Sequence, residues 1–234
     1  ALPNGQLPPL ALRAVSSTRL HVLQTCLFSH TTMTTSTALA IAQTAAQLAV
    51  EEGLEYSQAK KRALKQLRLP PRTPLPDNHL VEEAVREHLA LFCADTQPAE
   101  LEALRRLALH WMQRLNTFNP LIGGAVWRGT ATRLNDIYLH LFADDSKTVE
   151  IALIDQQLRY ATSQAKGLHG RSVEALSLQA WCQELQENIM IHLLVNEMDA
   201  QKGSLLPDAQ NSKPRGTTAM LQDMLTPRAV ADGA

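Results

Sequence analysis

The chain lacks several features that mark common classes of protein. Its 234 residues carry a formal net charge of -1, which excludes a strong whole-molecule field for nucleic acid or an acidic membrane surface. No apolar run approaches the ~18 residues that a membrane span needs. Its cysteines, Cys26, Cys93 and Cys182, are too widely spaced for a zinc knuckle or a disulfide framework. We therefore expect a cytoplasmic protein without a membrane segment.

Acidic residues are absent from the first 50 positions, and residues 1–32 are rich in Pro, Ser and Thr. An acid-free leader with Arg13 and Arg19 is typical of an organellar transit peptide. The alternative is a start codon placed too early, with Met33 as the native beginning. We favour the second interpretation, because residues 1–32 lack a sustained basic amphipathic period. We expect them to be a disordered leader or a mis-started extension outside the fold.

Aromatic residues are also scarce, at 4% against 45% for all hydrophobic residues, so the core must be mainly aliphatic. In the front half, apolar residues recur at the spacing of one helix face. Ser57 and Asn78 are suitable N-caps, and Gly53 and Pro70 are suitable stops. This pattern predicts a helical region over residues 33–118, with helices at about 37–52, 57–67, 78–92 and 98–115.

The periodicity changes to that of strands after Pro120. A helix of about 147–157, capped by Asp144 to Ser146, interrupts the strands. We expect an α+β fold in which the helical half packs on a small mixed sheet, with the turn over 123–132 at the sheet edge. The core should span 119–200, followed by a polar tail over 201–234 with a short helix at 217–225. The predicted strands are 121–126, 137–142, 159–163, 173–182 and 188–195, the last two as an antiparallel hairpin.

The most informative stretch is LIGGAVWRGTATRLNDIYLHLF, residues 121–142. It resembles the pattern G-S-x-A-R-G-T-A-x-x-x-S-D-I-D-L of the minimal nucleotidyltransferase family. The family's serine falls on Ala125, and its second aspartate falls on Tyr138. The residues that match are Gly124, Arg128, Gly129, Thr130, Ala131, Asp136, Ile137 and Leu139.

The resemblance implies a metal-dependent transfer of a nucleotide, in which paired carboxylates on one strand share two divalent ions. Asp136 would be the catalytic carboxylate and the first Mg²⁺ ligand. Tyr138 cannot replace the second carboxylate, because a phenol stays protonated near neutral pH. His140, Asp144 and Glu174 are the other candidates along these strands, although histidine is a poor Mg²⁺ ligand. The residues expected to cradle the phosphates of a nucleoside triphosphate are Gly123, Gly124, Arg128, Gly129, Thr130 and Thr132.

Two other interpretations stay open. In the first, the glycines and R-G-T-A-T form a tight strand-to-strand turn that Asp136 caps. The stretch from about Met33 to Leu225 also resembles a group of small bacterial proteins of unknown role, some of which carry the label UDP-N-acetylmuramate–alanine ligase. That chemistry needs G-x-x-G-K-[ST] for ATP, and GTATRL lacks the lysine.

We therefore expect a nucleotidyltransferase-like protein with a degenerate metal site, which binds a nucleotide or regulates a protein partner rather than acting as a robust transferase. The alternative is an active Mg²⁺-dependent nucleotidyltransferase. Mg²⁺ is expected as a cofactor only in the active case. The sequence carries no strong signal for nucleic acid.

Overall fold

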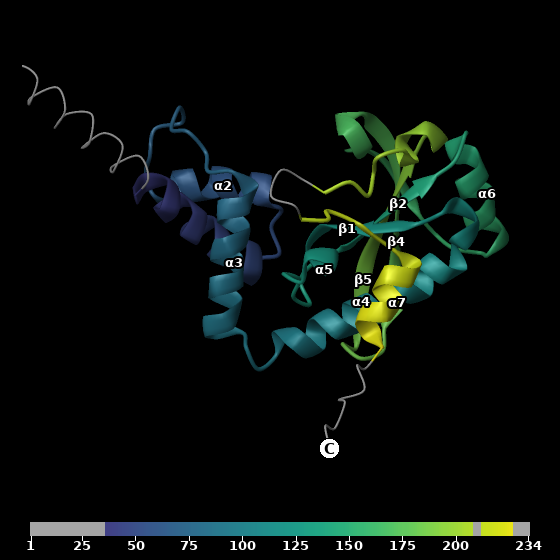
Figure 1. Ribbon diagram of the computed structural model, residues 1–234, viewed down its shortest axis with the longest axis horizontal. Coiled ribbons are helices and arrows are strands. Elements are labelled where there is room, and N and C mark those ends of the chain that lie inside the picture. Colours follow the sequence, from purple (N-terminus) through teal and green to yellow (C-terminus); the bar gives the residue numbers. More distant parts are fainter. Residues whose placement is uncertain (1–35, 208–211, 227–234) are drawn as a thin grey trace, which may run out of the picture.

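The computed structural model describes residues 36–207 and 212–226 (Figure 1). Helices at the front of the chain lie on one side of the molecule, and a mixed sheet with its own helices lies on the other. The expected α+β fold, with helices preceding the sheet, is therefore confirmed. The hypotheses about residues 1–32 and Met33 lie outside the described residues.

Three helices at the front share one aliphatic core. They are the helix over residues 36–51, α2 (Tyr56–Gln66) and α3 (Asn78–Phe92). Ile41, Ala59 and Val81, one from each helix, are fully buried in this core. The predicted caps were wrong by one or two residues: Glu55 precedes α2, and Asp77 caps α3 by accepting a hydrogen bond from the Leu80 amide at 2.8 Å.

Helix α4 (Gln97–Arg114) follows α3 but belongs to the second core. Its buried residues Leu104, Ala108 and Met112 recur at helical spacing and pack against the sheet. A short 3₁₀ helix (Asn116–Phe118) and Asn119, which has a positive φ of 47°, then turn the chain into the first strand. The helical region predicted from the sequence thus contributes to two separate cores.

The sheet has six strands in the order β3-β4-β5-β2-β1-β6. Strands β2 and β5 are parallel, and all other neighbours are antiparallel, so the sheet is mixed as expected. The predicted hairpin is confirmed as β4–β5. The strands are β1 (Leu121–Gly123), β2 (Ile137–Phe142), β3 (Ala161–Lys166), β4 (Ser172–Cys182), β5 (Glu187–Asn196) and β6 (Gly216–Thr217).

Two details of the predicted sheet were wrong. The strand expected over 121–126 ends at Gly123, where the chain enters the short helix α5 (Gly124–Arg128). The turn after β1 is also not at the sheet edge, because β6 pairs with the outer side of β1. The two-residue strand β6, which no local pattern in the sequence predicts, leads into α7 (Thr218–Leu225).

One face of the sheet is buried and the other is partly open. Helices α4, α7 and α6 (Ser146–Asp155) contribute to the core that covers the first face, where Ile137, Leu139 and Ile191 are fully buried. The alternate residues of the same strands, among them Tyr138, Ser177 and His192, are only half-buried on the other face. Short 3₁₀ helices, Leu168–Gly170 and Met198–Gln201, lie among the connections. Across the part of the chain that the structure describes, no helix combines the length and apolar character required to cross a membrane.

Candidate functional site

The site begins at the two glycines between β1 and α5. Gly123 pairs with Tyr138 across the β1–β2 ladder, and Gly124 has a φ of +71°, a conformation that other L residues rarely adopt. A Cβ atom at Gly124 would lie 3.5 Å from Cδ2 of Tyr138. The positive φ and this close approach together favour glycine at position 124.

Asp136 lies immediately before β2 and belongs to a polar chain across three strands. His192 Nε2 on β5 donates to Asp136 Oδ2 at 3.1 Å, and His192 Nδ1 lies 2.8 Å from Ser177 Oγ on β4. In the tautomer with the proton on Nε2, the Ser177 hydroxyl donates to Nδ1. The Asp136 carboxylate therefore already has an imidazole partner.

Tyr138 occupies the position where the family pattern has its second aspartate. Its ring stacks on the His192 ring, with centroids 4.8 Å apart and planes inclined at 26°. Burial raises the pKa of the Tyr138 phenol, and the neighbouring charges of Glu55 and Asp136 and a hydrogen bond to Glu55 raise it further. Tyr138 is thus a neutral, partly buried group held between Gly124 and His192.

A small cavity of about 200 Å³ adjoins Asp136 and Tyr138. Asp136, Tyr138, Asn135 and Ala125 line it from the core, and Gly53 to Glu55 and Gln58 line it from the front helices. Its two carboxylates, Glu55 and Asp136, come from different halves of the chain. The cavity is smaller than the roughly 300–1,000 Å³ typical of sites that enclose a drug-sized ligand.

Asp136, His192 and Ser177 form a chain of carboxylate, imidazole and hydroxyl groups. This is the order of groups in a hydrolytic triad. A triad also needs amide donors for the oxyanion. Ser177 lies inside β4, which pairs with β3 on one side and β5 on the other, so the surrounding amides belong to the ladders. We therefore assign these hydrogen bonds to the organisation of the open sheet face.

The donor set does not fit a two-metal centre. The cavity has two carboxylates, Asp136 and Glu55, of which Asp136 is hydrogen-bonded to His192 and Glu55 to Tyr138. The described residues contain no group of three or more His, Cys, Asp or Glu side chains placed to hold a metal ion. Histidine and a neutral phenol are poor substitutes for the hard oxygen ligands that Mg²⁺ requires. Magnesium therefore enters no step of the function proposed below.

The other acids considered from the sequence lie at the far end of β2. Glu174 pairs with Val195, which in turn pairs with Leu141. Leu141 is five positions beyond Asp136, or about 16 Å along an extended strand. Asp144 and Glu174 line a different cavity of about 200 Å³. The strand register thus excludes both as partners of Asp136.

His140, four residues beyond Asp136, is buried. Burial, together with a smaller effect of the nearby Arg215 charge, lowers the pKa of its imidazole to about 4. Asn196 Nδ2 lies 3.5 Å from His140 Nδ1. His140 is a neutral core residue rather than part of the Asp136 cavity.

Arg128, expected to bind phosphate, points toward the front helices instead. Its Nε lies 3.3 Å from Glu82 Oε2, and its guanidinium carbon lies 5.3 Å from the centre of the Tyr56 ring. Arg128 also lines a cavity of about 440 Å³ with residues from the start of α3, and Asp136 is not part of that lining. The structure therefore separates Arg128 from the carboxylate.

The remaining predicted cradle residues form a loop that α4 holds in place. Gln97 Nε2 donates to the carbonyls of Gly129 at 3.2 Å and Ala131 at 2.9 Å. The Thr130 hydroxyl lies 3.4 Å from that of Tyr56. The Thr132 amide donates to Asn135 Oδ1 at 2.8 Å. Of the predicted cradle, Gly123 and Gly124 adjoin Tyr138, and Thr132 adjoins Asn135, which lines the Asp136 cavity.

Three residues that shape this site, Glu55, Ser177 and His192, were not predicted from the sequence. Glu55 lies in the E-E-G-L-E-Y segment between two predicted helices, and nothing local connects it with Asp136, 81 positions later. Ser177 and His192 occupy half-buried positions of the predicted hairpin. The alternation of each strand indicates which face of the sheet Ser177 and His192 occupy. Only the parallel pairing of β5 with β2 places His192 beside Tyr138.

No family model matches this chain, and no similar sequence is found among curated proteins. Among solved structures, one partial similarity is to the Cid1 poly(U) polymerase with MgGTP bound, at 14% identity and a TM-score of 0.31. The similarity covers 47% of this chain and 38% of that chain. A TM-score of 0.31 is too low to establish a common fold.

Proposed function

We propose that this protein is a nucleotidyltransferase-like module that binds a nucleotide without catalysing its transfer. The observation that carries the proposal is the replacement of the second carboxylate: the glycine turn, β2 and Asp136 lie together, while Tyr138 fills the space beside Asp136 and stacks on His192. The glycine turn before a strand supports nucleotide binding, and the missing second carboxylate supports the loss of transfer.

The open sheet face offers room for the part of a nucleotide that the small cavity cannot hold. Gln179 and Met190 follow Ser177 and His192 along the β4–β5 hairpin, and Trp181 lies at its end with 55% of its surface exposed. An exposed indole stacks on any base without strong preference. His192 supplies Asp136 with a hydrogen-bond donor, so binding should persist when EDTA removes free metal ions.

The test is equilibrium dialysis of the protein against radiolabelled ATP, GTP, CTP and UTP in turn, with EDTA present. We expect saturable binding of at least one nucleotide. Gly124→Ala should weaken it about tenfold or more, because alanine at this positive φ costs roughly 1–2 kcal/mol and its methyl group would press on Tyr138.

The matched control is Gly170→Ala. Gly170 also has a positive φ, +75°, and its nearest outside neighbour would lie 3.5 Å from an added Cβ, but it belongs to the connection between β3 and β4. We expect Gly170→Ala to lose about as much stability as Gly124→Ala and to bind the nucleotide as tightly as the native protein. Failure of all four nucleotides to bind the native protein would refute the proposal.

A further inference from the structure

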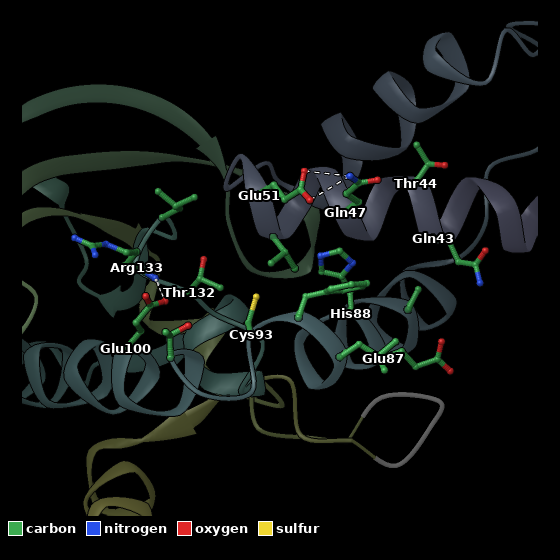
Figure 2. A pocket seen from close by; sticks show the side chains of 16 residues that line it. Gln43, Thr44, Gln47, Glu51, Glu87, His88, Cys93, Glu100, Thr132 and Arg133 are labelled. Carbon is green, nitrogen blue, oxygen red and sulfur yellow. Dashed lines mark hydrogen bonds between the residues drawn. The ribbon is translucent and has the colours of Figure 1, made fainter.

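A groove of about 830 Å³ lies between the helix over residues 36–51, α3 and the loop after Ala131 (Figure 2). In Figure 2 the first helix forms one wall with Gln43, Gln47 and Glu51, and α3 forms the other with Glu87 and His88. None of its lining residues lines the Asp136 cavity. The groove is therefore separate from the proposed nucleotide site.

Both walls present one helix face to the same space. Gln43, Gln47 and Glu51 follow one another at intervals of four residues. On α3, the lining residues Ala84, His88 and Leu91 repeat at i, i+4 and i+7. Residues at these spacings form a continuous stripe on a helix. Two such stripes facing a shared groove are the setting in which a third helix packs.

The groove exposes large apolar side chains at one end. Leu91 is 75% exposed, Phe92 is 72% exposed, and Leu134 from the opposite loop is 50% exposed. All three line the groove, together with the buried Val50. Apolar groups gathered in one concave place, rather than scattered over the surface, are typical of a binding surface.

The charges in the groove are negative. Glu51 and Glu87 line it, and neither makes an ion pair with any described residue, whereas the adjacent Glu52 pairs with Arg62 and the nearby Glu82 pairs with Arg86. Glu51 accepts only the Gln47 amide group among the described side chains. The single lysine or arginine in the lining, Arg133, is already paired with Glu187. The groove thus offers two carboxylates, Glu51 and Glu87, that no described cation neutralises, while its one arginine is paired with Glu187.

We propose that this groove binds an amphipathic helix of a partner protein, with leucine-like side chains on its inner face and lysine or arginine on its flanks. The apolar groups would pack on Leu91, Phe92 and Leu134, and the basic groups would reach Glu51 and Glu87. The lining from Gln43 to Glu51 extends about 12 Å along its helix, so a partner helix of about three turns would cover the groove.

The test uses a fluorescein-labelled peptide with leucines at helical spacing (i, i+3, i+4, i+7) and lysines at the remaining positions, and measures its anisotropy with the full chain. We expect saturable binding that weakens several-fold in the double variant Glu51→Gln and Glu87→Gln, because the variant removes two exposed charge pairs with the peptide. A second variant, Leu91→Ser with Phe92→Ser, should reduce binding further. These side chains are exposed, so circular dichroism should show an unchanged fold.

Two controls make the result specific. Glu102→Gln removes an exposed carboxylate of α4 outside the groove and should leave the affinity unchanged. A peptide with glutamate in place of lysine should not bind. Equal binding of the two peptides, or unchanged affinity in both groove variants, would overturn the proposal.

Other occupants give different outcomes. Concentration-dependent dimerisation in sedimentation, abolished by Leu91→Ser with Phe92→Ser, would assign the groove to a second copy of the chain and overturn the partner helix. Peptide binding that appears only after deletion of residues 1–32 would assign it to that segment and would also overturn the proposal.

Discussion

At the scale of single residues, Tyr138 decides how the site is interpreted. An aspartate here would complete a pair of carboxylates on one strand face, whereas the tyrosine brings a neutral ring that packs on His192 and hydrogen-bonds Glu55. The neighbouring Asp136 then has His192 as its partner at 3.1 Å. One substitution in the pattern thus changes the charge, the packing and the hydrogen bonding of the site together.

Tyr138→Asp should destabilise the protein by about 1–3 kcal/mol, because it places a third carboxylate beside Glu55 and Asp136 and removes the stacked ring. Thermal unfolding with and without Mg²⁺ or Mn²⁺ measures the effect, and metal should restore at most part of the loss. Tyr138→Phe, which keeps the ring, should cost about 1 kcal/mol and show no response to metal. Complete restoration of Tyr138→Asp by metal would show that an intact metal geometry persists.

His140 should make stability depend on pH. Its folded-state pKa of about 4 lies below the usual value of 6.5, so the unfolded chain binds more protons between these two pH values. The contribution to stability is complete above about pH 6.5 and is lost as the pH falls toward 4, for a total of roughly 3 kcal/mol.

Chemical denaturation at a series of pH values would measure this slope. His140→Leu should flatten it between pH 6.5 and pH 4, while His110→Leu, at an exposed position of α4, should leave it in place. An unchanged slope in His140→Leu would assign the pH dependence to other groups.

At the scale of elements, the loop after α5 depends on α4. Gln97 donates to two of its carbonyls, and Arg105 Nε donates to the Val126 carbonyl at 3.1 Å. Arg133 contributes its amide to Glu100 Oε2 at 3.0 Å. Side chains of α4 thus hold the backbone of the loop that the family pattern assigns to phosphate binding.

Gln97→Leu should therefore cost about 1–3 kcal/mol by leaving two part-buried carbonyls without their donor. Hydrogen exchange should increase over residues 129–135 before it increases in β4 or β5. Gln113→Leu, at an exposed position of the same helix, is the control and should change neither quantity. Unaltered exchange over 129–135 in Gln97→Leu would contradict the role given to this side chain.

The sequence predicted elements well where one local signal dominates. Helical spacing located α3 and α4, and alternation located β4 and β5 as a hairpin. It failed where distant pairing decides the outcome. Gly216 and Thr217 become a strand because β1 has a free edge, and Gly124 begins a helix rather than continuing β1. For the site, Asp136 and the glycine turn were predictable, but Glu55 and His192 reach it only through tertiary contacts.

In the whole molecule, the front half of the chain packs against the segment around the glycine turn. Arg128 joins α5 to Glu82 and Tyr56, and Glu55 reaches Tyr138 from the other half of the chain. A Cβ atom at Gly53 would lie 2.5 Å from the Leu134 carbonyl oxygen, which shows how tightly the two halves meet there. The front half therefore limits the space around Asp136 and belongs to the site.

We predict that the protein binds a nucleotide and does not transfer it, and one experiment tests both parts. The native protein is incubated with each of the four radiolabelled nucleoside triphosphates and Mg²⁺ or Mn²⁺, and bound nucleotide and released pyrophosphate are quantified in the same sample. We predict retained, unmodified nucleotide, no metal-dependent release of pyrophosphate, and no change of binding in Asp136→Ala. Metal-dependent release of pyrophosphate that Asp136→Ala abolishes would contradict the account and establish an active nucleotidyltransferase.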